Sequence, residues 1–173
     1  RCSINKAFAV VVRRFPNVAW SERFGTRPTA PGARSRILYV GRQNTGRLLS
    51  ERSHQWLHDL VTRYDGTYVA DMGELSLEDQ MKVFRAHDVV IGVHGNNLVG
   101  VMWMMPGAHV FEILPLELKK LVYDYHCLAL SMRHQYTQIH CVGTVPETGS
   151  LDGSFSLTRS SEAGLEAHLH MLR

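Results

Sequence analysis

Two glycine-containing loops hold the residues whose chemistry is most specific. The first runs from Gly41 to Arg47, reads Gly-Arg-Gln-Asn-Thr-Gly-Arg, and contains the guanidinium groups of Arg42 and Arg47. Guanidinium groups bind phosphate oxygens in a bidentate geometry, and glycine lets the backbone approach a diphosphate. No Gly-Lys-Ser/Thr follows, so the loop is not a Walker loop. Taken alone, it is equally well interpreted as an exposed basic turn.

The second loop reads Gly-Val-His-Gly-Asn-Asn-Leu and leads into an apolar segment that favours a helix. Backbone N–H groups at a helix start carry partial positive charge and attract an anion. His94 can donate a hydrogen bond to a phosphate oxygen or assist a departing diphosphate. A histidine beside an apolar run is usually a core residue, but the glycines and the helix start favour a functional role. The anion-contacting residues predicted beside it are Gly95, Asn96, Asn97 and Leu98.

Glu112 interrupts the apolar run Val110-Phe111-Glu112-Ile113-Leu114. A carboxylate without a partner in a buried strand costs several kcal/mol, on the order expected for buried ions. Two kinds of partner satisfy it: the ribose hydroxyls of a bound nucleotide, or an arginine from the first loop. We favour the ligand slightly over a structural ion pair.

The elements around these loops alternate between short β-rich runs and segments with a helical period of roughly 3.6 residues. Parallel strands need helical crossovers, so the pattern predicts an α/β fold, a Rossmann-like, doubly wound parallel sheet. Ligands bind such sheets at the carboxyl ends of the strands, where both loops and Glu112 belong. The predicted strands are Ile37–Gly41, Thr67–Asp71, Asp88–Val93, His109–Leu114 and His134–Cys141.

Helices are predicted between these strands from their apolar stripes and caps. The first follows Ser50 and ends near Tyr64, and the second follows Ser76 with Leu77, Met81 and Phe84 on one side. The others are Asn97–Met105, Leu118–Met132 and Glu162–Leu172, and residues 143–161 are predicted to be a loop. A weak helix at Ile4–Arg13 and a linker precede the first strand, which divides the chain into residues 1–35 and a lobe of residues 36–173.

Composition restricts the class of protein. The chain has 173 residues, 45% of them hydrophobic, which is enough for one sizeable core. The net charge of +3 suits a phosphate-bearing ligand, but the basic residues are scattered, which disfavours a nucleic-acid partner. The sequence opens on Arg1, is interpreted as a fragment, and contains no apolar run long enough to cross a bilayer. Any targeting segment or membrane anchor is therefore expected outside it.

Cysteines and histidines give no metal signature. Cys2, Cys127 and Cys141 form neither a disulfide framework nor a metal knuckle. One pair can bridge in an oxidising lumen, but buried thiols are favoured for Cys127 and Cys141. His54 and His58 share one helix face without the adjacent glutamate of a zinc-protease helix, so we interpret them as structural.

Several segments together resemble a known family: 38–42 (Leu-Tyr-Val-Gly-Arg), 47–51 (Arg-Leu-Leu-Ser-Glu), 86–95 (Ala-His-Asp-Val-Val-Ile-Gly-Val-His-Gly), Pro106-Gly107 and 110–113 (Val-Phe-Glu-Ile). In this order they resemble the carboxyl-terminal lobe of family-61 glycosyltransferases. That family includes EGF-domain O-GlcNAc transferases, the protein O-mannose β-1,4-GlcNAc transferase, and plant and fungal xylosyl- or arabinosyltransferases. The resemblance covers roughly Arg36 to Tyr136 and is weaker towards the end.

The resemblance implies one lobe of a GT-B enzyme that transfers xylose, GlcNAc or arabinose, with inversion, from a UDP-sugar to a hydroxyl of a glycan or protein. Arg42 and Arg47 match the family's loop arginines, His94-Gly95 its His-Gly turn, and Glu112 its carboxylate. Asn97 stands where glycine is usual, and Val99 where threonine is frequent. The resemblance also implies that no metal or other cofactor is required. It places the complete protein in the Golgi or endoplasmic reticulum lumen as a single-pass membrane protein.

Three alternatives remain. A catalytically inactive module would bind the nucleotide-sugar without transferring it. A Rossmann oxidoreductase would need a Gly-x-Gly-x-x-Gly turn, which the first loop lacks. A nucleic-acid binder is disfavoured by the modest charge.

Overall fold

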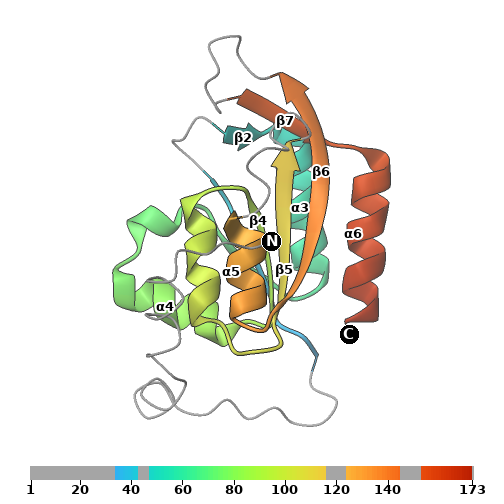
Figure 1. The fold of residues 1–173 in the computed structure, drawn as a ribbon. Coiled ribbons are helices and arrows are strands. Elements are labelled where there is room, and N and C mark those ends of the chain that lie inside the picture. The colour runs from blue at the N-terminus through green and yellow to red at the C-terminus, as the bar shows by residue number, and fades with distance from the viewer. Residues whose placement is uncertain (1–33, 43–46, 116–123, 145–152, 173) are drawn as a thin grey trace.

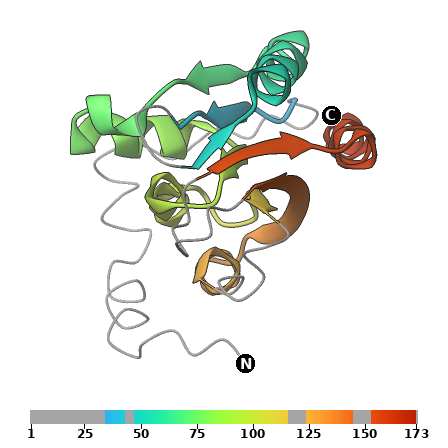
Figure 2. The ribbon, with the colours of Figure 1, turned by 90° about the horizontal axis from the view of Figure 1, so that it is seen from above.

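The computed structural model describes residues 34–42, 47–115, 124–144 and 153–172 of the chain. Within these residues, seven strands form one curled sheet that lies between helices (Figures 1 and 2). The strand order is β2-β7-β6-β5-β4-β1-β3. The helix and linker predicted before Arg34 lie outside the described residues.

Five of the strands are parallel neighbours, and all five correspond to predicted ones. The strand β6 extends three residues beyond the predicted end at Cys141. The α/β prediction with a mainly parallel sheet is therefore confirmed. The bounds are β1 Ile37–Val40, β3 Thr67–Val69, β4 Val89–Val93, β5 His109–Pro115 and β6 Gln135–Thr144.

Two further strands correct the prediction. β7 (Gly153–Leu157) lies in the segment predicted to be a loop and pairs antiparallel with β6. β2 (Arg47–Leu49) pairs in parallel with β7, so Arg47 begins a strand and is not a loop residue. Phe155 and Leu157 are buried, whereas Ser154 is exposed and Ser156 is half-buried, an alternation typical of a strand.

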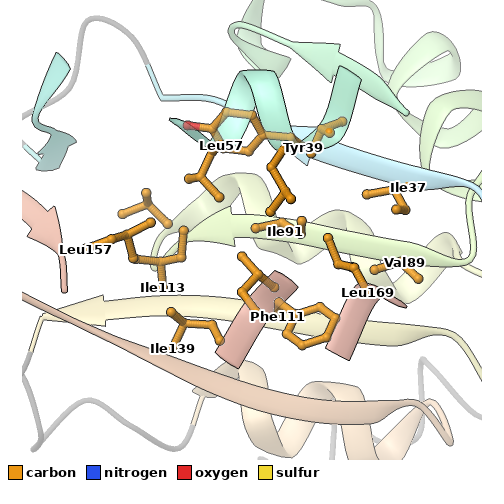
Figure 3. Packing of buried hydrophobic residues seen from close by; sticks show 14 of the residues in the cluster. Ile37, Tyr39, Leu57, Val89, Ile91, Phe111, Ile113, Ile139, Leu157 and Leu169 are labelled. Carbon is orange, nitrogen blue, oxygen red and sulfur yellow. The ribbon is translucent and has the colours of Figure 1, made fainter. Parts of the chain in front are cut away.

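One face of the sheet is covered by α3 (Glu51–Arg63) and α6 (Arg159–Met171) (Figure 1). Figure 3 shows Leu57 of α3 and Leu169 of α6 packed over side chains of the strands, among them Ile91 and Phe111. Both helices begin where a side-chain oxygen accepts from a backbone N–H, at Ser50 for α3 and at Thr158 for α6. The predicted cap at Ser50 is confirmed.

Ion pairs tie these two helices together. Arg52 of α3 donates from both terminal nitrogens to Glu162 of α6, at 2.8 and 3.1 Å. Arg63 donates to Glu166 at 2.9 Å farther along the same pair. Glu162 is mostly buried and binds Arg52 in a bidentate geometry. The Arg52–Glu162 pair therefore holds α3 against α6 more firmly than the exposed Arg63–Glu166 pair does.

The opposite face is covered by α4 (Leu77–Ala86), η2 (Asn96–Trp103) and α5 (Asp124–Ser131), and η1 (Met72–Glu74) adds Met72. Two details differ from the prediction: η2 is a 3₁₀ helix, and Leu77 is exposed while Phe84 is buried. Helices on both faces agree with the doubly wound expectation. None of the helices in the described ranges is long and apolar enough to span a membrane.

The cysteines differ from the expectation of two buried thiols. Cys141 in β6 is a buried thiol, as predicted, but Cys127 in α5 is disulfide-bonded. Cys2 lies outside the described residues. A residue inside helix α5 therefore forms a disulfide bond, which the periodicity of apolar residues cannot predict.

The connections set where a ligand crevice belongs. From β1 the chain passes through α3 to β3 on one side, and it then returns through α4 to β4 on the other side of β1. The connections therefore diverge between β1 and β4, the switch point at which open α/β sheets bind ligands.

Candidate functional site

Arg42 and His94 meet at the switch point. Arg42 follows β1 and His94 follows β4, and these parallel strands are direct neighbours, with Val40 opposite Gly92. The Arg42 guanidinium donates from Nη1 to the backbone carbonyl of His94 at 3.0 Å. The two loops identified in the sequence are therefore in contact, and the Arg42 guanidinium group lies at the carboxyl ends of β1 and β4.

Gly95 makes this contact possible. Its backbone angles, φ 151° and ψ 178°, lie in a region that is essentially restricted to glycine. A Cβ atom at this position would lie 1.5 Å from Nη1 of Arg42. The glycine thus lets the turn pass directly beneath the guanidinium group.

The three predicted residues after Gly95 differ in placement. Asn97 donates from its side chain to the carbonyl of Gly41 at 3.2 Å, which makes a second tie between the loops. Asn96 is exposed at the start of η2. Leu98 is fully buried in the core, and its N–H donates to the Gly95 carbonyl at 2.9 Å. Leu98 therefore anchors the turn with an apolar side chain.

Glu112 is the centre of a buried hydrogen-bonded chain. One carboxylate oxygen contacts Nδ1 of His94, and the other accepts from the phenol of Tyr136. Glu112 is 1% and His94 5% exposed. The sequence indicated that Glu112 needs a partner, named as ribose or a loop arginine. The structure gives both of its oxygens partners within the protein, neither of which is an arginine.

Strand register explains why these groups meet. Glu112 lies opposite Gly92, which has no side chain, and His94 follows two residues later and donates its N–H to the Ile113 carbonyl at 2.9 Å. Tyr136 lies opposite Val110, two residues from Glu112 on the same face, and a long side chain spans that diagonal. Burial, and then the charge of Glu112, raise the pKa of the Tyr136 phenol, so it remains a donor.

α5 supports this chain from the side. Tyr125 packs edge-on against the His94 ring, with centroids 5.1 Å apart, and the His126 ring lies 4.8 Å from that of Tyr136. Neighbouring residues of one helix thus limit the movement of both groups that contact Glu112.

A pocket of about 250 Å³ opens next to Arg42, on the α3 face of the sheet. Inside it, His54 is held by hydroxyls: Nδ1 lies 2.9 Å from the Tyr39 hydroxyl and Nε2 3.4 Å from that of Tyr68. Burial, and then Tyr68, raise the pKa of Tyr39. The described residues that line the pocket are Tyr39, Arg42, Leu48, Leu49, Glu51, His54 and Val93.

The remaining predicted site residue is Arg47. Its backbone opens β2 opposite Gly153, but its side chain lies outside the described part of the structure. A shared role for Arg42 and Arg47 therefore stays a prediction. Within the described ranges, no group of three or more His, Cys, Asp or Glu side chains is arranged to hold a metal ion.

Sequence reasoning missed Tyr136, Tyr125 and the pocket residues Glu51 and His54. Tyr136 was assigned to a strand, and the only signal for its role was its place on a strand adjacent to that of Glu112. Tyr125 lies within the predicted helix Leu118–Met132 and packs in the core, as an apolar helix residue would. Glu51 belongs to segment 47–51, which resembles the family, and begins a predicted helix, but neither pattern indicates that it lines a pocket with Arg42.

Comparison with known proteins adds one finding. A family model described as glycosyltransferase 61 matches residues 4–111, which is more than half of the chain. The match includes Arg42, Arg47, His94 and Gly95, and it ends one residue before Glu112. A search of curated proteins found no match.

Proposed function

The chain belongs to glycosyltransferase family 61, a membership that suggests sugar transfer from a donor to a glycan acceptor, and we propose that it binds a UDP-sugar at the Arg42–His94 site. The transferred sugar is xylose, GlcNAc or arabinose, and the acceptor is a hydroxyl of a glycan or protein. The chain acts as the donor-binding lobe of a GT-B enzyme.

The contact between Arg42 and the His94 turn carries this proposal. A nucleoside diphosphate needs cationic and N–H donors at one place, and this structure gathers them at the switch point of its sheet. The guanidinium group binds phosphate oxygens directly, and the first N–H groups of η2 lack partners within the helix and carry partial positive charge. Asn96 and Asn97 supply these groups, and Leu98 and Gly95 hold the turn in place.

In the proposed reaction, the acceptor oxygen attacks the anomeric carbon on the face opposite the diphosphate. The bond from that carbon to the β-phosphate oxygen breaks, the acceptor hydroxyl gives its proton to a general base of the other lobe, and UDP departs with the electron pair. Inversion follows from this single displacement. Negative charge grows on the leaving oxygen, and Arg42 and His94 stabilise it by hydrogen bonds that strengthen as the charge develops.

Glu112 has the role of a positioning residue in this proposal. The carboxylate contacts Nδ1 of His94 and orients the ring, and its negative charge balances the ring when both nitrogens carry a proton, the form in which Nε2 donates to the leaving oxygen. Tyr136 and Tyr125 restrict the pair further. Arg47 is proposed as a second phosphate-binding cation.

No metal is needed in this mechanism, because Arg42 and His94 supply the positive charge at the leaving group. We place the complete protein in the Golgi or endoplasmic reticulum lumen, as part of a single-pass membrane protein whose anchor lies outside these residues. The disulfide at Cys127 supports that location, because disulfides persist in oxidising compartments.

The test is transfer itself. The complete protein, with both lobes, is incubated with UDP-xylose, UDP-GlcNAc and UDP-arabinose and a panel of glycan and glycopeptide acceptors, and UDP release and product are measured. We expect one donor to give product of inverted anomeric configuration, with turnover at least about tenfold lower in His94→Ala. UDP binding without transfer to any acceptor would instead support the inactive binding module, and product of retained configuration would contradict the proposed displacement.

A further inference from the structure

The pocket on the α3 face is separate from the buried His94–Glu112–Tyr136 chain. Tyr39 and Val93 contribute to the core on the α3 face, whereas Glu112 contacts Tyr136, which packs on the α5 face. Arg42 belongs to both regions: it lines the pocket and contacts the His94 carbonyl. If Arg42 holds the middle of an extended ligand, one end of that ligand lies in the pocket on the α3 face and the other end lies beside the His94 turn.

We propose that this pocket binds the nucleoside of the donor, with Glu51 accepting hydrogen bonds from the ribose hydroxyls. This inference rests on the proposed function, because it starts from a diphosphate at Arg42. Bond breaking takes place beside His94, so the sugar and the β-phosphate lie on that side. The nucleoside, at the other end of the diphosphate, then lies in the pocket.

The size and walls of the pocket fit a nucleoside. About 250 Å³ is enough for a pyrimidine and a ribose, and Leu48, Leu49 and Val93 provide apolar contacts for a flat base. Both ring nitrogens of His54 face tyrosine hydroxyls of the protein. His54 therefore offers ring surface, which suits a base better than a sugar with many hydroxyls.

Glu51 is the carboxylate among the described residues that line the pocket, and it is exposed in the first turn of α3. An ionised carboxylate is an acceptor with two oxygens, which matches the paired 2′- and 3′-hydroxyls of a ribose. Beside a diphosphate its charge is otherwise unfavourable, because like charges repel. The proposal therefore predicts opposite behaviour for two ligands. Removal of the Glu51 charge weakens binding of the nucleotide but does not weaken binding of a bare diphosphate.

The experiment measures binding of UDP, 2′-deoxy-UDP and inorganic pyrophosphate to the full chain and to Glu51→Gln by calorimetry. Glu78→Gln is the matched control, since Glu78 is also an exposed acid in the first turn of its helix, on the opposite face of the sheet. We expect Glu51→Gln to weaken UDP about five- to tenfold, the effect of one hydrogen bond to a charged group. The same change should affect 2′-deoxy-UDP less and leave pyrophosphate equal or tighter.

The possible failures are distinguishable. If UDP binds and Arg42→Ala weakens it while Glu51→Gln does not, the nucleoside lies elsewhere, and the proposed function stands without this inference. If Glu51→Gln and Glu78→Gln weaken UDP equally, Glu51 has no specific contact and the inference is overturned. If no uridine nucleotide binds to folded protein, both the inference and the proposed function fail.

Discussion

The carboxylate of Glu112, in the middle of β5, contacts Nδ1 of His94, which directly follows the neighbouring parallel strand β4, and both side chains are almost completely buried. We predict that Glu112→Gln preserves the shape of this pair but removes its charge. Turnover should fall about ten- to a hundredfold, the effect of losing a charge-assisted hydrogen bond, with little change in KM for the donor. Steady-state kinetics with the preferred UDP-sugar measure both quantities.

A merely structural role for Glu112 predicts something different. In that case the unfolding midpoint would drop while the activity of the folded fraction stayed unchanged. Nitrogen NMR of His94 separates the two, because we expect Glu112→Gln to change which ring nitrogen carries the proton. Unchanged His94 resonances together with unchanged turnover would remove Glu112 from the mechanism.

Gly95→Ala should weaken UDP binding by at least about tenfold, because the added Cβ atom would lie 1.5 Å from Nη1 of Arg42 and displace that group. Gly107→Ala is the matched control: Gly107 also has a positive φ, 88°, but no atom lies within 4 Å of its added Cβ. Both variants bear backbone strain of about 1–3 kcal/mol. Equal UDP affinities for the two folded variants would mean that UDP binding does not depend on the contact between Arg42 and the His94 turn.

Acid should destabilise the fold through His109. Burial, and then His168 of α6, lower its pKa from 6.5 to about 4, while Nε2 lies 2.8 Å from the Thr137 hydroxyl. Between these two values the unfolded chain binds more protons, so this contribution is complete above about pH 6.5 and is lost as pH falls toward 4. It amounts to at most about 3 kcal/mol.

Urea unfolding at pH 7.5 and 4.5 measures this effect. We expect His109→Gln to reduce the loss of stability between the two pH values, and His170→Gln, at an exposed position of α6, to leave it unchanged. The pKa of His134 is also lowered by burial and adds to the loss in the same direction. A His109→Gln variant with the full wild-type difference would contradict the assignment.

Reduction should destabilise the protein through Cys127. Breaking a native disulfide typically costs about 2–5 kcal/mol, so a reductant should lower the thermal midpoint. Cys127→Ala should be insensitive to reductant, whereas Cys141→Ala, which removes a buried thiol, should remain sensitive. Reductant sensitivity that persists in Cys127→Ala would show that the effect arises elsewhere.

Sequence patterns predicted the parallel part of the sheet because its strands are apolar runs with clear helical crossovers. Continuous burial of β1 and β4 gives such runs directly. Sequence patterns did not predict β2 and β7. β2 is only three residues long, and it pairs with a strand more than a hundred residues away. Nothing local in Arg47–Leu49 encodes that partner.

The candidate site was predictable only in part, for the same reason. Arg42 and His94 are unusual residues that follow apolar strands, and ligands bind at the carboxyl ends of such strands, so the sequence alone places both at one crevice. Tyr136 lies in a predicted strand and Glu51 in a segment that resembles the family, but neither pattern indicates what the side chain contacts. They join the site through strand register and helix placement, which depend on the whole fold.

Binding of UDP at Arg42 tests the central claim most directly. Calorimetric titration of the folded chain with UDP, GDP and NAD, beside Arg42→Ala, separates nucleotide classes and the proposed contact in one experiment. We predict selective binding of UDP that weakens at least about tenfold in Arg42→Ala, with no binding of NAD. Equal UDP affinity for wild type and Arg42→Ala, or preference for NAD, would contradict a donor-binding site at this switch point.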